Sequence, residues 1–434
     1  MKTKILFTLL AITVFCNLYA QQWQRIGLEK ERVNAIAVNP LNNAIIYAGS
    51  TSSFSDGIYG KLLRSSDFGN TWDTLMYNIS VQKIALHPKK PNIIYVALAS
   101  TNFTRPGILK STNAGESWFW ADSGITLNFE ISVATVVAHP DSFDVVYAGT
   151  VGFFGGNMYK SIDGGNYWTK YPDEVMCCQF EDIFFDPVEP STIYVGSGKL
   201  YRTVDDGKNW TAVQDWTAES GGVKLAIDNK NNNTLYAGRP RYRLEKSVDY
   251  GENWFFADTG ITDYRFQDLD ISLIDSKKLF TITADGIVFT ADGAVSWYPN
   301  NQGFPIDLIK RTLELSPDES FLYCGTDSGL YKLDLVTSLE NNSNYQPGKA
   351  TLLQNYPNPF NSTTTIPFTL DKPDNLEINL YDTSGKRVYQ SGNNSYAAGY
   401  NEHKINLKNI ATGLYFYELQ SKRTILRKKL LLIK

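Results

Sequence analysis

The octapeptide SIDGGNYW, Ser161 to Trp168, belongs to a series of near copies spaced along the chain. The other copies are SSDFGNTW (65–72), STNAGESW (111–118), TVDDGKNW (203–210), SVDYGENW (247–254) and the weaker TADGAVSW (290–297). The third positions, which lie 46, 50, 42, 44 and 43 residues apart, are Asp67, Asn113, Asp163, Asp205, Asp249 and Asp292. A repeat of this period indicates a solenoid or a propeller.

A second landmark precedes each octapeptide and occurs once more after the last of them. It is a β-prone run that ends in an aromatic and a small residue, at Tyr47, Tyr95, Tyr147, Tyr194, Tyr236, Phe280 and Tyr323. Another apolar run precedes each of these landmarks, so every unit is predicted to contain four short strands joined by turns. This pattern predicts an all-β fold, a β-propeller with seven blades.

The seventh unit lacks an octapeptide, and its outermost strand is therefore missing after GLYKLDL, Gly329 to Leu335. The segment QWQRIG, Gln22 to Gly27, offers a spare strand near the N-terminus, and its Trp23 matches the tryptophan that ends each octapeptide. We expect this strand to complete the seventh blade and to close the ring, because closure removes an exposed sheet edge.

The first 20 residues, MKTKILFTLLAITVFCNLYA, have two lysines, a short apolar run and a terminal small residue. This order is typical of a secretory signal peptide, which we expect to be cleaved near Ala20. No later segment of the sequence resembles a transmembrane helix. The remaining cysteines, Cys177, Cys178 and Cys324, do not form a disulfide framework, so stability must come from packing.

The charge distribution is uneven, because residues 1–351 contain 30 Lys and Arg against 39 Asp and Glu, whereas residues 352–434 contain 11 against 6. An acidic body argues against nucleic acid as a partner, since phosphate binding needs a basic face. We expect residues 21–335 to form the propeller and the polar residues 336–351 to form a linker.

The octapeptide template resembles the Asp-box, or BNR, repeat of bacterial sialidases, sortilin-type propellers, xyloglucan-active glycosidases and photosystem assembly factors. The resemblance covers residues 22–335 and implies a propeller in which the boxes are structural and remote from the ligand. The residues agree with this, because the aspartate can accept backbone hydrogen bonds in a turn, the glycine permits a positive φ and the tryptophan can pack between blades.

Residues 352–434 contain YPNPFN (356–361), LYDTSGK (380–386), GLY (413–415) and a basic, apolar terminus, RKKLLLIK (427–434). Alternating apolar positions predict a small, immunoglobulin-like β-sandwich. The segment closely resembles the type A C-terminal sorting domain of the Bacteroidetes type IX secretion system. The resemblance implies export across the outer membrane, an interaction of residues 352–434 with that machinery, and removal of the domain.

Motifs for chemistry are scarce in the propeller. His87 and His139 precede prolines at equivalent turn positions of the repeat, where a turn role is expected. Neither a phosphate-binding glycine loop nor a metal motif is present, so the sequence indicates no cofactor and no metal. A glycoside hydrolase needs two carboxylates at a controlled separation, and the many acidic residues make such a pair possible without locating it.

The loops between the second and third strands are long in blades 1, 2, 3 and 5, which predicts a ligand face there. The candidate residues on this face are Phe54, Tyr59, Phe103, Arg105, Phe153, Phe154, Arg239, Arg241, Tyr242 and Arg243. Exposed aromatic and arginine side chains suit a sugar or a protein surface, but these residues can equally pack on neighbouring loops.

Two functions therefore remain open. The first is a secreted or surface-displayed propeller that binds a glycan or protein without catalysis, and the second is a sialidase-like or xyloglucanase-like glycoside hydrolase. Scaffold motifs without a recognisable catalytic set favour the first. Carboxylates and arginines that converge on the central funnel would favour the second.

Overall fold

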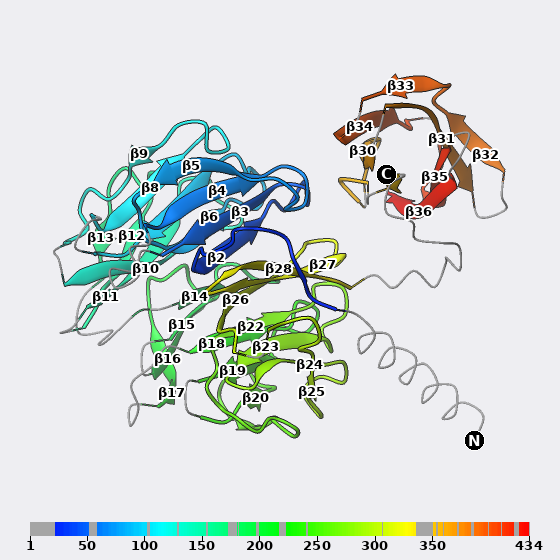
Figure 1. Cartoon of the computed structure of the whole chain (residues 1–434). Coiled ribbons are helices and arrows are strands. Elements are labelled where there is room, and N and C mark those ends of the chain that lie inside the picture. Colours follow the sequence, from blue (N-terminus) through cyan, green and yellow to red (C-terminus); the bar gives the residue numbers. More distant parts are fainter. Residues whose placement is uncertain are drawn as a thin grey trace, which may run out of the picture. The chain divides into compact units, whose positions relative to one another are not determined.

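The computed structural model describes residues 22–51, 59–101, 105–127, 130–152, 155–171, 180, 182–196, 199–216, 223–239, 242–305, 307–335, 350–352, 355–358, 360–370, 373–382, 386–397, 399–408, 410–420 and 425–433. These residues contain strands and turns and no α-helix, and they fall into two compact units, 22–335 and 350–433. The first unit consists of seven four-stranded antiparallel sheets (Figure 1). The all-β, seven-bladed prediction is confirmed.

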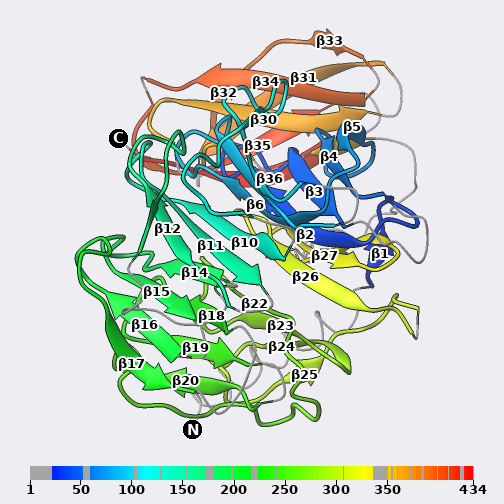
Figure 2. The ribbon, with the colours of Figure 1, turned by 90° about the vertical axis from the view of Figure 1, so that its left-hand side faces the viewer.

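Each blade runs outward from an innermost strand in chain order. Blade 1 contains β2 (Val33–Val38), β3 (Ile46–Ser50), β4 (Lys61–Ser65) and β5 (Asp73–Tyr77). Blade 2 contains β6 (Val81–Leu86), β7 (Ile94–Leu98), β8 (Gly107–Ser111) and β9 (Phe119–Trp120). Blade 3 contains β10 (Ile131–Ala138), β11 (Val146–Gly152), β12 (Met158–Ser161) and β13 (Thr169–Lys170). Blade 4 contains β14 (Asp182–Phe185), β15 (Ile193–Gly196), β16 (Lys199–Thr203) and β17 (Thr211–Asp215). Blade 5 contains β18 (Lys224–Ile227), β19 (Leu235–Gly238), β20 (Glu245–Ser247) and β21 (Phe255–Phe256). Blade 6 contains β22 (Asp268–Ile271), β23 (Leu279–Thr283), β24 (Gly286–Thr290) and β25 (Tyr298–Pro299). Figure 2 shows the order of β14 to β17 in blade 4.

The seventh blade combines both ends of the propeller sequence. Its strands β26 (Lys310–Leu315), β27 (Phe321–Thr326) and β28 (Gly329–Asp334) are completed by β1 (Gln24–Arg25), which pairs antiparallel with β28. Trp23 is 3% exposed, packs on Phe304 at 4.8 Å between ring centroids, and donates its indole N–H to the Asn300 carbonyl at 3.0 Å. The ring is therefore closed by β1, as the sequence predicts.

The octapeptide forms the turn between the third and fourth strands. In SIDGGNYW the Ser161 hydroxyl accepts the Gly165 N–H at 2.8 Å and lies 2.7 Å from Asp163 Oδ1, which also accepts the Tyr167 N–H at 2.9 Å. Gly165 has a φ of +89°. Backbone and hydroxyl hydrogen bonds lower the pKa of Asp163, because they favour the charged carboxylate. Asp163 thus holds a turn.

The octapeptides also join neighbouring blades. The tyrosine of the second landmark donates its hydroxyl to the carbonyl of the fourth octapeptide position in the next blade, over 2.8–3.5 Å. A lysine or arginine paired with that tyrosine across the strands donates to the same carbonyl, over 2.6–3.2 Å. The tyrosine–cation pairs are Tyr47 with Arg64, Tyr95 with Lys110, Tyr147 with Lys160, Tyr194 with Arg202 and Tyr236 with Lys246. We call these five arrangements the interblade latches.

Blade 6 has no latch, because the next blade has no octapeptide to accept the two donors. The residues at the latch positions are Phe280 and Phe289, which pair across β23 and β24 and lie 6.4 Å apart between ring centroids. In blade 6, two apolar rings thus replace the tyrosine–cation pair where an acceptor is missing. In blade 7, Tyr323 is fully buried and its hydroxyl has no hydrogen-bond partner among the described residues.

The second unit is a β-sandwich. One sheet contains β29 (Ala350–Leu352), β30 (Thr363–Leu370) and β34 (Gly399–Asn406); the other contains β31 (Asp374–Asp382), β32 (Arg387–Gln390), β33 (Asn394–Tyr396), β35 (Gly413–Gln420) and β36 (Ile425–Leu432). Buried side chains from both sheets form one core, including Phe368, Ile378, Ile405, Tyr417 and Leu430.

Candidate functional site

The propeller has two different faces. One holds the octapeptide turns, and we call it the octapeptide face. The other holds the loops between second and third strands and the loops that lead into the next blade, and we call it the long-loop face. Of the predicted ligand residues, Phe54, Phe103, Phe153, Phe154 and Arg241 lie outside the described residues. The other five lie on the long-loop face, and Tyr59 is 52% exposed.

Arg105, in blade 2, is bound to its own blade. Its guanidinium forms an ion pair with Asp122 at 3.1 Å and lies over the Trp120 ring, 4.0 Å from the centroid. Gly107 makes room for this arrangement, because a Cβ there would meet the Asp122 carboxylate and the Trp120 ring. The long-loop face thus holds the arginine between an acid and an aromatic ring.

Arg243, in blade 5, has nearly the same surroundings. Its Nε and Nη2 each donate to Asp258 at 2.7 Å, and its guanidinium lies 3.9 Å from the Phe256 ring centroid. The hydrogen bonds to Asp258 raise the pKa of Arg243. Since Arg105 and Arg243 belong to different blades, the structure does not bring them together.

Arg239 and Tyr242 do meet. The Arg239 guanidinium lies 4.6 Å from the Trp216 ring and 4.7 Å from the Tyr242 ring, and it forms an ion pair with Glu245 at 3.0 Å. Each of the three described arginines of the predicted ligand face is therefore bonded to a carboxylate and stacked on an aromatic ring. The sequence could not reveal this for Arg105 and Arg243, because their partners Asp122 and Asp258 lie 17 and 15 residues further along the chain.

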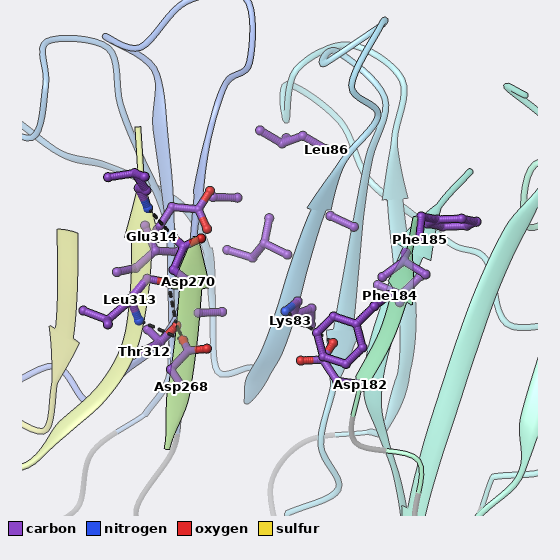
Figure 3. A pocket seen from close by; sticks show the side chains of 18 of the residues that line it. Lys83, Leu86, Asp182, Phe184, Phe185, Asp268, Asp270, Thr312, Leu313 and Glu314 are labelled. Carbon is purple, nitrogen blue, oxygen red and sulfur yellow. Dashed lines mark hydrogen bonds and ion pairs between the residues drawn. The ribbon is translucent and has the colours of Figure 1, made fainter. Parts of the chain in front are cut away.

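The innermost strands surround a central channel with a volume of about 1040 Å³ (Figure 3). Its charged lining residues include Lys83, Asp182, Lys224, Asp268, Asp270, Arg311 and Glu314. Asp182, Lys224 and Asp268 begin their strands and so lie at the channel end that opens on the long-loop face. Figure 3 shows Lys83 beside Asp182, with Asp268, Asp270 and Glu314 across the pocket.

The carboxylates of blade 6 bind backbone amides of blade 7. Asp268 Oδ2 accepts the Leu313 N–H at 2.8 Å and the Thr312 hydroxyl at 2.9 Å, and Asp270 Oδ2 accepts the Leu315 N–H at 2.8 Å. An innermost strand has no further strand to pair with on its channel side, so these carboxylates satisfy its free amides.

Glu314 and Lys83 complete the polar lining. Glu314 Oε1 accepts the Val38 N–H of blade 1 at 3.3 Å. Burial raises the pKa of Glu314 to about 8 and that of Asp270 to about 6. Asp182 lies 3.6 Å from the Lys83 amine and 3.7 Å from the Lys224 amine, and its charge raises the pKa of Lys83.

The channel residues were missed at the sequence level. Their signal is a charged side chain inside the first apolar run of a unit, as Lys83 in KIALHP or Asp270 in LDISL, where the first unit has Ala35 and Ala37. The convergence of carboxylates that would favour an enzyme is present, but each of them accepts a backbone amide or forms an ion pair with lysine.

The two propeller histidines have the expected turn role. His87 Nδ1 accepts the Lys89 N–H and His139 Nδ1 accepts the Asp141 N–H, both at 3.1 Å. Asn39 and Asp186 accept the amide two residues later at the equivalent turns. Among the described residues, no three His, Cys, Asp or Glu side chains are grouped so that they could hold a metal ion.

The fold and the site together define a seven-bladed β-propeller with a polar channel, followed by a β-sandwich. Residues 354–434 match the model of the secretion system C-terminal sorting domain. The sorting-domain prediction is confirmed, and the chain is exported by the type IX secretion system to the cell surface or beyond it. In the part of the chain that the structure describes, no helix is long and apolar enough to cross a lipid bilayer.

Solved structures with a similar fold include an enzyme and a component of a secretion system. The GH74 enzyme of Niastella koreensis has 14% identity and a TM-score of 0.58, with 95% of this chain and 75% of that chain covered. YCF48 of Cyanidioschyzon merolae has 13% identity, a TM-score of 0.54, and coverages of 72% and 98%. PorZ of Porphyromonas gingivalis, a surface component of its type IX secretion system, has 13% identity, a TM-score of 0.50, and coverages of 94% and 60%. No curated protein matches the chain by sequence.

Proposed function

We propose that the propeller is a binding module for a glycan or protein ligand, acts without catalysis, and recognises the ligand with its long-loop face. The proposal extends to the route of export. Residues 1–20 are a signal peptide cleaved near Ala20, residues 21–335 are the exported propeller, residues 336–351 are a linker, and the sorting domain is removed after it has engaged the secretion machinery.

One observation supports binding over catalysis. The three described arginines of the predicted ligand face and the four channel carboxylates are already bonded within the protein, as Arg243 to Asp258 and Asp268 to the Leu313 N–H. A catalytic acid or base must exchange a proton with the substrate and therefore needs a carboxyl group that can reach it. Exposed aromatic side chains remain for contact with a ligand.

A glycoside hydrolase is the second candidate, because four carboxylates line one channel: Asp182, Asp268, Asp270 and Glu314. Two of them, Asp270 and Glu314, have raised pKa values, as a general acid requires. Solved structures of this fold include a GH74 xyloglucanase of Xanthomonas campestris and a YCF48 bound to a D1 peptide. The fold is therefore compatible with both enzymes and binding proteins.

The test is a glycan array probed with residues 21–434, run beside a panel of chromogenic glycosides and soluble polysaccharides. We expect ligand retention on the array without release of chromophore or reducing sugar. Turnover that Asp268→Asn or Glu314→Gln abolishes, in variants that melt at the parent temperature, would replace the binding proposal with the hydrolase.

The export route has its own test. A chain that lacks residues 352–434 should accumulate in the periplasm with its first 20 residues removed, and the full chain should reach the surface or the medium. N-terminal sequencing of both forms locates the cleavage near Ala20. Delivery of the truncated chain to the surface would contradict the proposed role of the sorting domain.

A further inference from the structure

Blades 2 and 5 contain the same local sequence directly after the octapeptide tryptophan. The segments are WFWADSGIT (118–126) and WFFADTGIT (254–262), which differ at two of nine positions. Trp120 and Phe256 occupy equivalent places on the outermost strand, opposite Leu109 and Glu245. At the same place the other blades have Thr74, Lys170, Ala212, Pro299 and Arg25, so the aromatic ring is particular to blades 2 and 5.

Each ring is stacked against an arginine and remains accessible. Trp120 is 46% exposed and Phe256 is 58% exposed, although a guanidinium lies about 4 Å from each ring. The aspartates that fix the two arginines are buried, Asp122 at 9% exposure and Asp258 at 4%. We call Trp120 with Arg105 and Phe256 with Arg243 the two ring platforms.

The guanidinium reaches the same place from different positions. Arg105 lies four residues before Leu109, whereas Arg243 lies two residues before Glu245. The pairing of a guanidinium with an aspartate and a ring is therefore repeated although the arginine position is not.

The fold does not need this arrangement. The loop after each segment holds the next tryptophan, as when the Ser123 carbonyl accepts the Trp168 N–H and the Thr259 carbonyl accepts the Trp297 N–H. In blade 6 the Gln302 carbonyl accepts the Trp23 N–H in the same way, and that blade has no ring platform. A role in scaffolding alone leaves the exposed rings unexplained.

The platforms fit a neutral sugar better than a protein or an acidic sugar. A protein interface needs about 800 Å² on each partner, and these are single rings on blades that are not neighbours. Each cation is already paired with a carboxylate, so neither platform offers net charge to an acidic sugar. The ring face suits the apolar face of a pyranose, and the guanidinium has further N–H groups for its hydroxyls.

We infer that the two ring platforms are paired binding sites for pyranose units of a neutral polysaccharide. This inference rests on the proposed binding function and specifies its ligand class. Two separate sites on one propeller let a polymer bind at both, so that weak single contacts add through avidity.

The test is electrophoresis of residues 21–434 through native gels that contain hydroxyethylcellulose, mannan or laminarin, with polygalacturonate and alginate as acidic controls. We expect at least one neutral polymer to retard the parent. Trp120→Ala or Phe256→Ala should lower the apparent affinity at least about tenfold, and the double variant should lose retardation. Tyr77→Ala and Phe119→Ala, which remove exposed aromatics outside the platforms, should migrate as the parent.

Trp120→Phe, which keeps a ring, should restore retardation, and every variant should melt within two or three degrees of the parent. Calorimetry with a short oligosaccharide of the retarding polymer should count two sites in the parent and one in each single variant. The inference that the platforms bind sugar would be overturned if no neutral polymer retarded the parent, or if the double variant were retarded as much as the parent. Binding to other array ligands would then leave the proposed function standing, whereas hydrolysis of the polymer would overturn that function and not the platforms.

Discussion

The octapeptide face and the long-loop face of the propeller differ in how regularly they repeat. On the octapeptide face, the same donors and acceptors recur blade after blade and five interblade latches join successive blades. Among the described residues of the long-loop face, the ring platforms occur only in blades 2 and 5, and the acidic residues of the innermost strands lie in blades 4, 6 and 7. Regular contacts thus stabilise the ring, and irregular ones are available for recognition.

Ring closure should give the largest effect. Trp23→Ala removes a buried ring from the seventh blade and leaves a cavity beside Phe304, which should lower the free energy of unfolding by about 3–5 kcal/mol. Urea unfolding followed by tryptophan fluorescence measures the loss. Trp210→Ala is the control, because Trp210 is only partly buried and lies in a blade formed by four consecutive strands. An equal loss in both variants would contradict the special role of closure.

The interblade latches should contribute less. Tyr95→Phe removes a buried hydrogen bond to the Gly164 carbonyl and should lower the free energy of unfolding by about 1 kcal/mol. Tyr323→Phe is the matched control, since the Tyr323 hydroxyl has no hydrogen-bond partner in the part of the chain that the structure describes, and it should leave stability unchanged or raise it. If the two changes lowered the free energy of unfolding equally, the hydrogen bond of the latch tyrosine would not contribute to stability.

The channel should show a smaller, pH-dependent effect. The pKa of Glu314 is about 8 in the folded chain against an ordinary 4.5, so the folded state binds the proton more tightly than the unfolded state. The resulting contribution to stability is present below pH 4.5 and is lost as the pH rises towards 8. As the pH rises from 5 to 9, the urea concentration at half unfolding should therefore decrease less in Glu314→Gln than in the parent. An unchanged pH profile would show that the Glu314 carboxyl is not protonated in the channel.

Much of the architecture could be predicted from the sequence, because a repeat displays the same turn chemistry six times. The octapeptide turns, the histidine turns and the closure by Trp23 all rest on residues close together in the chain or on a counted repeat. The latches could also have been noticed, since Phe280 and Phe289 break the pattern together just before the unit that lacks an octapeptide.

The candidate site was harder to predict, because its contacts join residues from different strands and blades. Asp182 of blade 4 forms an ion pair with Lys83 of blade 2, and Asp268 binds the Leu313 N–H of the next blade. Arg105 and Arg243 are on the predicted face, but their partners Asp122 and Asp258 follow the outermost strand of the blade, 17 and 15 residues further along the chain. Short-range patterns contain no information on such pairings.

The central claim, that one face stabilises the ring and the other recognises the ligand, can be tested by one paired measurement. Melting temperature and retardation in the neutral-polysaccharide gel are recorded for Tyr95→Phe/Tyr147→Phe and for Trp120→Ala/Phe256→Ala. We expect the double tyrosine variant to melt several degrees lower than the parent and to be retarded like the parent. We expect the double platform variant to melt like the parent and not to be retarded. A tyrosine variant that loses retardation but not stability, or a platform variant that loses stability but not retardation, would contradict this division between the two faces.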